Sequence, residues 1–470
     1  MKSAEKNGIT LLLASLAVGT FMSALDTSAV TVASTAIKNS FGISLSTVEW
    51  VITGYLLVIS SLLLTFGRLA DIHGHRKIYI LGFSVFTAGS LLCGLSTSIA
   101  SLIGFRVLQA IGAAMMFSSN SAIITANVPA EKRGKAFGII AVAVAFACCV
   151  GPVAGGFLVG ALGWRSIFLV NVPVGIIGTA LAFRFIPHDQ KKQGQRFDMI
   201  GSALIFAALF LVLLPLDLSA SKGFPVPVFT ALLCGGLALT AVFILWERKT
   251  PYPMLKLALF KNRVFSASLA ATVFNFSAQF MMAFLAPYYF QNVRAMSPAL
   301  TGLLYMPMPL ATILVAPISG SFSDKHDSRL LSAGGMAVMA SGFCMLAFLD
   351  TSTPYWFIVI AMILAGTGSG MFQSPNNSAV MGSVPAEYRG SASGTLATMR
   401  NVGMVLGVAL SGALFSWGSA HAALMPEATH YTGLAFTQYL ATNGLKVTFL
   451  AAAATALCGM TASLVKGKTR

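Results

Sequence analysis

The chain alternates between long apolar runs and short polar connections. Fourteen runs come close to the roughly 20 apolar residues that an α-helix needs to cross a hydrocarbon core about 30 Å thick. We therefore predict an all-α, polytopic membrane protein with 14 transmembrane helices. The predicted helices cover residues 9–33, 47–66, 78–95, 99–126, 136–158, 166–186, 199–218, 226–246, 264–290, 300–322, 330–349, 355–382, 391–417 and 445–465.

The two halves of the sequence repeat one another. Segment 129–138 (PAEKRGKAFG) returns 256 positions later as segment 385–394 (PAEYRGSASG), and the same offset carries Asn120 onto Asn376. Six predicted helices lie in each half, and the two in the middle have no counterpart. Parallel repeats of this kind are a transporter architecture. We predict a six-helix bundle over 1–190, a linker with an inserted two-helix hairpin over 191–260, and a second six-helix bundle over 261–470.

Composition agrees with membrane insertion and indicates the orientation. Hydrophobic residues make up 56% of the chain and charged residues 9%, and the mean hydropathy is +0.81. The formal charge of +16 does not point to nucleic acid, because the basic residues stand in short groups between apolar runs. Most of the 30 Lys and Arg residues fall on the side of the N-terminus, which predicts that both termini are cytoplasmic. The five on the opposite side are Lys38, Arg165, Lys222, Arg294 and Lys446.

Several classes of protein find no support in the sequence. All six cysteines fall inside apolar runs, so neither a disulfide framework nor a zinc site is indicated. The first run begins at Ile9, is about twice as long as a signal-peptide core and lacks a clear cleavage site, so we expect it to remain as a helix. We recognise no nucleotide-binding glycine loop, metal cluster or catalytic triad. We therefore expect neither enzymatic activity nor a cofactor.

Charge and glycine concentrate in the connection between predicted helices 2 and 3. This loop contains Gly67, Asp71, Gly74, Arg76 and Lys77. Glycines allow helix ends to approach closely, and Asp71 could lie against the positive N-terminus of another helix, a contact worth about 0.3–2 kcal/mol. Such a contact, made in one conformation and broken in another, would act as a gate. The alternative is that the charges only fix topology.

A degenerate copy of this loop lies between predicted helices 10 and 11. It keeps Gly320, Asp324 and Arg329, but Asp327 stands where the pattern requires glycine. A gate contact made by the second copy is therefore less well supported than one made by the first.

Predicted helix 5 carries small residues at helical spacing around a proline. Gly151, Gly155 and Gly156 permit close backbone packing, and Pro152 removes one helix hydrogen bond and favours a bend. Two interpretations stay open. The glycines form either ordinary small-residue packing or a seam that closes the transport cavity on one side.

Ionisable residues within the membrane give the strongest indication of function, because each costs several kcal/mol unless it is paired or hydrated. Asp26 is the one acid well inside a predicted helix, and Arg106 and Arg400 are the corresponding bases. Asp26 and Arg106 each lie about seven residues from the outer end of their helix, so both should lie roughly 10 Å below that boundary. They can form either a proton-coupling pair or a structural ion pair. Three other acids stand at outer helix ends, where we expect solvation: Glu49, Asp217 and Asp350.

A polar stripe runs along predicted helix 9. Asn275 and Gln279 stand at positions i and i+4 near mid-membrane, and this face should not contact lipid. Phe280 follows directly, and Tyr305 stands on the next helix. Aromatic rings and flexible sulfur-containing side chains suit a surface that accepts varied amphipathic molecules.

Five motifs, in the same order along the chain, resemble those of the major facilitator superfamily and of its fourteen-helix drug:proton antiporters. They are Leu25-Asp26-Thr27, the Gly67–Lys77 loop, the segment from Arg106 through Gln109 to Gly112, the Gly151–Gly156 segment and the Trp164–Gly175 segment. The resemblance covers essentially the whole chain. It implies two six-helix bundles around a central cavity, with helices 1 and 4 side by side at that cavity. It also implies that the partner of Asp71 is the start of helix 13, near residues 390–394.

This resemblance implies a proton-coupled antiporter that exports amphipathic drugs or related small molecules across the cytoplasmic (inner) membrane of a bacterium. The expected partners are a small-molecule substrate, protons and lipid, without nucleic acid and as a monomer driven by the proton gradient. Asp26 and Arg106 would carry proton coupling. Substrate would contact Asp26, Gln109, Asn275, Gln279, Phe280, Tyr305 and Arg400.

The sequence also leaves another transport mode open. The same fold could carry one physiological solute, neutral or anionic, by uniport or symport. The glycine motif of helix 5 favours exchange, since the superfamily associates it with exchangers. The second half is poor in acids, and its predicted helix 13 carries Arg400 and no carboxylate, which favours an anionic or neutral substrate.

Overall fold

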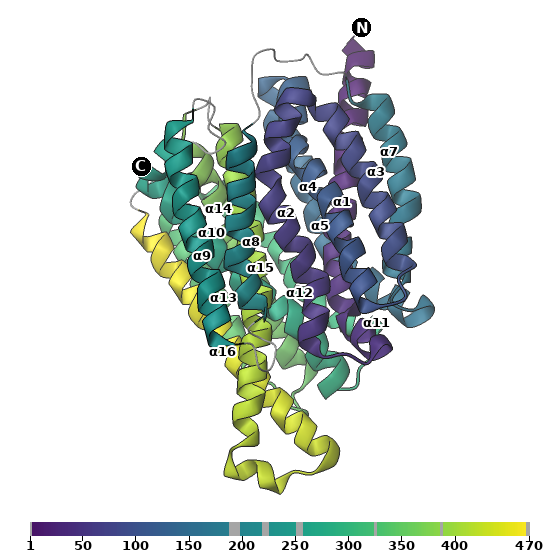
Figure 1. The fold of residues 1–470 in the computed structure, drawn as a ribbon, viewed down its shortest axis with the longest axis vertical. Helices are drawn as coiled ribbons and strands as arrows, with labels where there is room; N and C mark the ends of the chain where they lie inside the picture. Colours follow the sequence, from purple (N-terminus) through teal and green to yellow (C-terminus); the bar gives the residue numbers. More distant parts are fainter. Residues whose placement is uncertain are drawn as a thin grey trace.

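The computed structural model describes residues 2–187, 198–218, 225–250, 257–323, 327–385 and 389–466, and over these residues it contains helices and no β-strand. The helices form two bundles that stand side by side (Figure 1). Helix α1 (Lys2–Phe41) crosses the first bundle. We call the end of the molecule where α1 begins the near end, and the end where it finishes the far end.

The first bundle contains the helices predicted from the first six apolar runs. Their bounds differ from the prediction in two ways. Helix α1 continues past residue 33 to Phe41, and the sixth run is divided by Val170 into two helices. After α1 come α2 (Leu45–His73), α3 (His75–Gly94), α4 (Ile99–Asn127), α5 (Ala130–Leu162), α6 (Ser166–Leu169) and α7 (Asn171–Phe185).

The second bundle shows similar departures. The tenth run is divided at Met306, directly before Pro307, whose ring nitrogen cannot donate a helix hydrogen bond. The last helix begins at Gly433, twelve residues before the predicted start at 445. The helices are α10 (Arg263–Tyr288), α11 (Pro298–Tyr305), α12 (Pro307–Ser323), α13 (Ser328–Leu346), α14 (Tyr355–Gly382), α15 (Arg389–Ala423) and α16 (Gly433–Val465), with short turns η1 (Leu257–Lys261), η2 (Tyr289–Val293) and η4 (Pro426–His430).

Each of the fourteen apolar runs coincides with helix, but not every helix is long and apolar enough to be counted as a span. Among the described residues, 12 helical segments qualify by themselves. Helix α2 qualifies only as a pair of segments, Thr47–Leu63 and Thr65–His73, that meet at an angle of 49°. Within α8 (Met199–Leu218), the apolar helical segment Met199–Val212 is too short to count as a span. The count of 14 therefore stays a prediction.

The sequence repeat corresponds to a repeat in packing. In the first bundle, Asn120 of α4 donates a hydrogen bond to Thr20 Oγ1 of α1 at 2.7 Å. In the second, Asn376 of α14 donates to Thr272 Oγ1 of α10 at 2.9 Å. Helices α1 and α4 thus meet as α10 and α14 do. This equivalence lets each residue of one bundle be compared with its counterpart in the other.

The bundles contact each other at the far end. Gln291 Nε2 donates to the Val32 carbonyl oxygen at 3.1 Å, and Asn292 Nδ2 lies 3.4 Å from Thr35 Oγ1. Helix α5 also packs on α11 there, because a Cβ added at Gly156 would collide with the Pro298 carbonyl. Close backbone packing between the halves therefore seals this end.

The inserted hairpin consists of α8 and α9 (Val226–Lys249). Helix α8 packs on α2 and α15, one helix from each bundle, and α9 lies on its outer side (Figure 1). Asp198 caps the start of α8 by accepting from the Gly201 amide at 2.8 Å, and it accepts from Trp246 Nε1 at 2.9 Å. The pair is thus fastened together beside the bundles, over the line where they meet.

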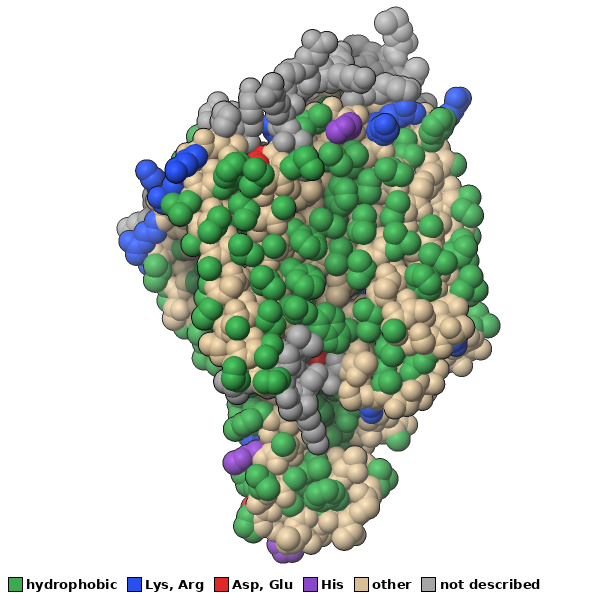
Figure 2. Space-filling view, viewed as in Figure 1, with side chains coloured by type: hydrophobic (Ala, Val, Ile, Leu, Met, Phe, Trp, Pro, Cys, Tyr) green, Lys and Arg blue, Asp and Glu red, His purple; other side chains and the backbone are tan. Residues whose placement is uncertain are grey.

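The surface has the character expected in a bilayer. Apolar side chains cover most of the face in Figure 2, and Lys and Arg gather toward the near end. Beyond the far end, the extended parts of α15 and α16 project together as a hairpin (Figure 1). Tyr431 and Tyr439 stack within this hairpin with ring centroids 4.7 Å apart.

Candidate coupling and transport site

Asp26 and Arg106 form an ion pair inside the first bundle. Arg106 Nη1 lies 2.5 Å from Asp26 Oδ2, and each residue is 1% exposed. Helix α1 supplies the acid and α4 the base. The sequence prediction that these two residues are level with each other is consistent with this contact.

Two amides complete the environment of the Asp26 carboxylate. Gln109 Nε2 donates to Oδ1 at 3.0 Å, and Asn171 Nδ2 donates to the same oxygen at 2.8 Å. Gln109 Nε2 also lies 2.7 Å from Ser90 Oγ, and Arg106 Nη1 donates to Gln109 Oε1 at 2.6 Å. Asp26 thus accepts hydrogen bonds from three donors, which are Arg106, Gln109 and Asn171.

Helix α2 supports Arg106 from its other side. Arg106 Nε donates to the Val51 carbonyl oxygen at 2.9 Å, and the guanidinium lies 4.0 Å from the centroid of the Tyr55 ring. A cation over an aromatic face in a dry setting is stabilised by about 2 kcal/mol. Five helices therefore contribute to this coupling cluster, which we define as Asp26, Arg106, Gln109, Asn171, Ser90 and Tyr55.

Among the described residues of the second bundle there is no equivalent of this cluster. The offset from Thr20 to Thr272 carries Asp26 onto Ala278, and the offset from Asn120 to Asn376 carries Arg106 onto Met362. Both counterparts are apolar and buried. The polar cluster is therefore a property of one half only, rather than a packing device shared by the repeat.

Sequence reasoning identified part of the cluster. It proposed Asp26, Arg106 and Gln109 but assigned no role to Asn171, Ser90 or Tyr55. Asn171 stands within the Trp164–Gly175 motif and is the one amide side chain in its apolar run. That isolation was a usable signal. Ser90 and Tyr55 carry no such signal, because serine and tyrosine are common in these helices.

The predicted stripe on α10 does not form one continuous face toward the first bundle. Asn275 is fully buried, and its Nδ2 lies 3.3 Å from Met336 Sδ and 3.6 Å from Met339 Sδ of α13. Gln279 Nε2 donates to Ser369 Oγ of α14 at 2.9 Å. Both amides therefore point into their own bundle. The structure does not bring them together with Asp26.

The remaining predicted binding residues lie nearer the line between the halves. Phe280 packs against α15, where a Cβ at Gly407 would lie 2.9 Å from Phe280 Cβ. Arg400 of α15 lies 5.0 Å from the Phe276 ring centroid. Tyr305 ends α11, and both it and Arg400 lie near Cys148 of α5.

Comparison with known proteins assigns the chain to a family. Residues 16–408 match the Major Facilitator Superfamily. The chain belongs to the Major Facilitator Superfamily. It is 34% identical to the riboflavin transporter RibZ of Clostridioides difficile, over 86% of this chain and 88% of that protein.

Other members of the superfamily match over similar lengths. The multidrug resistance protein Stp of Mycobacterium tuberculosis is 31% identical, over 87% of this chain and 76% of Stp. The methylenomycin A resistance protein of Bacillus subtilis is 31% identical, over 93% and 91%. The fold matches an inward-facing bacterial homologue of the human lysosomal transporter Spinster, with a TM-score of 0.68 at 16% identity over 97% of this chain and 96% of the other. These relatives establish a multi-span transporter and give no indication of catalysis.

The superfamily loop between α2 and α3 forms a tight turn in which Asp71 contacts two basic side chains. Gly74 adopts φ 99°, a conformation that favours glycine. Asp71 is 40% exposed and lies 3.1 Å from His75 Nε2 and 4.0 Å from Arg68 Nη1. The predicted contact of Asp71 with the start of α15 stays a prediction, because part of that segment lies outside the described residues.

The other residues of the loop have distinct positions. Arg76 Nη2 donates to the Phe183 carbonyl oxygen at 2.7 Å, so it binds the C-terminal turn of α7. Cations are stabilising at helix C-termini. Lys77 is exposed, and Gly67 is in ordinary contact with Ser118. Arg76 thus has a structural role in this state in addition to any effect on topology.

The second copy of the loop is described only in part. Asp324 lies outside the described residues. Gly320 packs against the Ser374 side chain, where a Cβ would collide. Asp327, which replaces the glycine of the first copy, caps α13 by accepting from the Arg329 amide at 2.9 Å. The substitution therefore exchanges a flexible turn for a helix cap.

The glycine motif of α5 faces two partners. A Cβ at Gly151 would collide with Ser28, and one at Gly155 would lie 3.0 Å from Ala29 Cα, so both glycines pack on α1. Gly156 and Pro152 instead contact α11 of the other bundle, the latter opposite Gly302. The motif thus joins the coupling helix α1 to the seam between the halves.

One expectation about the acids is wrong. Glu49 was expected to be solvated at its helix end, yet it is 0% exposed and its carboxylate lies directly against Gly412 of α15. The reason is that the first turn of α2 lies inside the seam at the far end. Asp350 is exposed as expected. Hydrogen bonds from Ser352 and Thr353 hold the pKa of Asp350 below its usual value, against the opposing effect of partial burial. The side chain of Asp217 lies outside the described residues.

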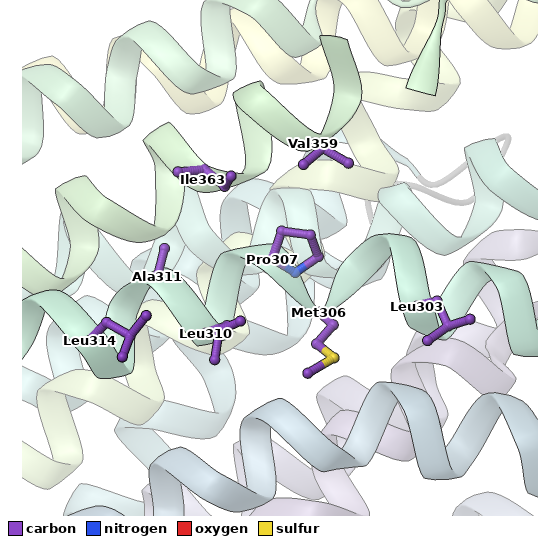
Figure 3. Close-up of a pocket in the computed structure, with 8 residues that line it drawn as sticks. All are labelled: Leu303, Met306, Pro307, Leu310, Ala311, Leu314, Val359 and Ile363. Atoms are coloured by element: carbon purple, nitrogen blue, oxygen red, sulfur yellow. The ribbon is translucent and has the colours of Figure 1, made fainter. Parts of the chain in front are cut away.

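A groove of about 360 Å³ lies where α11 gives way to α12, and none of the predicted site residues lines it. Its lining is apolar and includes Met306, Pro307 and Ile363 (Figure 3). Leu303 and Leu314 of this groove are largely exposed on the outside of the bundle. The groove therefore has the character of a lipid-facing surface rather than of a polar transport site.

Proposed function

We propose that this protein is a proton-coupled antiporter that exports amphipathic small molecules across the cytoplasmic membrane of a bacterium. In this proposal it has 14 spans, both termini lie in the cytoplasm, and a monomer works on the proton gradient without a cofactor. The observation that carries the proposal is the enclosed Asp26–Arg106 pair, which the other half of the repeat lacks.

The cluster can couple proton binding to a change of conformation. In the observed state Asp26 is paired with Arg106 and the cluster as a whole is near neutral. Protonation of Asp26 would leave the Arg106 guanidinium buried without a counterion, which costs several kcal/mol. Rearrangement that lets water or substrate reach Arg106 relieves that cost. A proton on Asp26 therefore favours a second conformation.

The connection to the gate runs through α1. Gly151 and Gly155 hold α5 against α1 within a few residues of Asp26, and Gly156 holds α5 against α11 at the far end. A shift of α1 on protonation would disturb this packing and open the seam. Asp71 would latch the near end in the opposite state. Substrate would pass between the bundles, contacting Gln279, Phe280, Tyr305 and Arg400.

A second candidate function is transport of one physiological solute. It is favoured by the 34% identity to a protein named as a riboflavin transporter. The two candidates differ in breadth of substrate and in the direction in which a proton gradient moves the substrate.

Transport by purified protein in proteoliposomes tests the proposal. With a panel of dyes and drugs plus riboflavin, we expect several compounds to be moved against their gradients when only a pH gradient is imposed. Collapse of that gradient with nigericin should abolish uphill movement. Downhill transport of a single compound, unaffected by nigericin, would support the specific carrier instead.

A further inference from the structure

Arg400 is a positive charge without a carboxylate partner among the residues that the structure describes. Its side chain is half-buried, and its Nε is enclosed without a hydrogen-bond partner. The guanidinium rests on the Phe276 ring at 5.0 Å. A charged residue inside the membrane that has no counterion carries an energetic penalty, so its presence indicates a functional site.

The nearby ionisable groups do not neutralise this charge. The electrostatic neighbour of Arg400 is Cys148 of α5, a thiol. Among the described residues of the first bundle, two acids are buried. Asp26 is already paired with Arg106 and accepts from two amides. Glu49 lies at the far end against Gly412. Arg400 therefore adds a positive charge to the space between the bundles, and no described carboxylate forms an ion pair with it.

The position of Arg400 points to a ligand rather than to folding alone. Phe276 belongs to α10, Cys148 to α5 and Tyr305 to α11, so side chains from both bundles surround the same space. Tyr305 also lies near Cys148. In transporters built from two repeats, the substrate lies at the interface between them.

We infer that Arg400 binds an anionic group of the substrate, and that the preferred substrates are planar aromatic organic anions such as carboxylates. This inference rests on the proposed function and specifies its substrate class. A guanidinium binds carboxylates through paired hydrogen bonds, and the Phe276 and Tyr305 rings offer flat surfaces for an aromatic body. A cation about 5 Å away, at an effective dielectric constant of about 20, would be disfavoured by about a hundredfold.

Two dyes with the same ring system test the charge preference. Fluorescein is anionic and rhodamine 123 is cationic, and binding of each to purified protein in nanodiscs can be followed by fluorescence anisotropy. Other aromatic carboxylates are tested in the same way as further anionic ligands. The variants are Arg400→Gln, which removes the charge, and Arg400→Lys, which retains it. Arg248→Gln removes an exposed charge on α9 and is the matched control.

We expect Arg400→Gln to weaken binding of fluorescein or another carboxylate at least about tenfold, as loss of a charged hydrogen bond implies. Arg400→Lys should retain much of the affinity for the carboxylate, and Arg248→Gln should retain all of it. Rhodamine 123 should bind to Arg400→Gln no more weakly than it binds to the wild type. Size-exclusion profiles and melting temperatures establish that each variant is folded. The inference is overturned if no carboxylate binds the wild type, or if Arg400→Gln binds the carboxylates as well as the wild type does.

These outcomes are separate from failure of the proposed function. Uphill, pH-driven transport of rhodamine 123 without any anion binding would leave the antiporter intact and remove the anion site. Anion binding that depends on Arg400, in a protein that does not respond to a pH gradient, would retain the site and remove the antiporter.

Discussion

The coupling pair can be tested by separating its electrical from its structural role. In Asp26→Asn the Oδ1 position still accepts from Gln109 and Asn171, while the amide NH₂ replaces the oxygen that faces Arg106. The substitution therefore removes the ion pair and sets the amide NH₂ against the Arg106 N–H donor. At 2.5 Å and an effective dielectric constant of about 20, the Coulomb energy of the pair is about 7 kcal/mol. Measured losses on breaking buried pairs are about 3–5 kcal/mol.

We expect Asp26→Asn to lower the free energy of unfolding by about 4 kcal/mol, because Arg106 stays buried without its counterion. The double variant Asp26→Asn/Arg106→Gln removes both charges and should recover most of that loss. Unfolding in mixed detergent micelles measures this cycle. Transport should behave differently, since neither variant has a carboxyl group to carry the proton.

The transport assay is uphill accumulation in proteoliposomes with only a pH gradient supplied. We expect both variants to bind substrate and to equilibrate it, but not to concentrate it. The reasoning fails if the double variant, once stability is recovered, concentrates substrate as the wild type does. Asp26 and Arg106 would then be a structural ion pair, and the coupling proton would bind elsewhere.

Three further predictions concern the seam, the loop and the C-terminus. Gly156→Ala should lower the free energy of unfolding by about 1–3 kcal/mol and reduce transport, because the added Cβ collides with α11. Gly160→Ala is the control, since its Cβ meets nothing within 4 Å and should have little effect in the same assay. Equal transport by the two variants would show that the α5 seam has no part in the mechanism. Asp71→Asn should slow turnover while expression and melting temperature stay near wild type. The substitution removes the charge that contacts His75 and a state-dependent contact worth about 1 kcal/mol. Transport at the wild-type rate would show that Asp71 only fixes topology. Burial lowers the pKa of Lys466 from 10.5 to about 8, against the opposing charge of a nearby aspartate. The folded state therefore loses this proton at a lower pH than the unfolded state does. The free energy of unfolding should rise between about pH 8 and 10.5. Lys466→Met should therefore raise the melting temperature at pH 7 and lose that advantage near pH 10.5; a pH-independent difference would contradict the assignment.

The sequence by itself determined properties that run along one helix. Apolar runs located the helices, because a bilayer requires about 20 apolar residues per span and a backbone without free polar groups. The 256-residue offset matched Asn120 with Asn376, and the structure shows that each donates to an equivalent threonine, Thr20 or Thr272. The depth argument for Asp26 used the end of its apolar run, although α1 itself continues to Phe41. The contact between Asp26 and Arg106 agrees with the expectation that the two residues are level with each other, while their depth below the boundary stays a prediction.

The tertiary structure decided which neighbour each helix face meets. Asn275 and Gln279 share a face at helical spacing, yet they point toward α13 and α14 rather than toward Asp26. Glu49 stands at a helix end and is nevertheless fully buried, because α15 covers it. Position along a helix is set by 1.5 Å of rise per residue, which the sequence carries. Rotation about the helix axis and the partner across it depend on how all the helices pack together, so only the structure could bring Asn171 to Asp26.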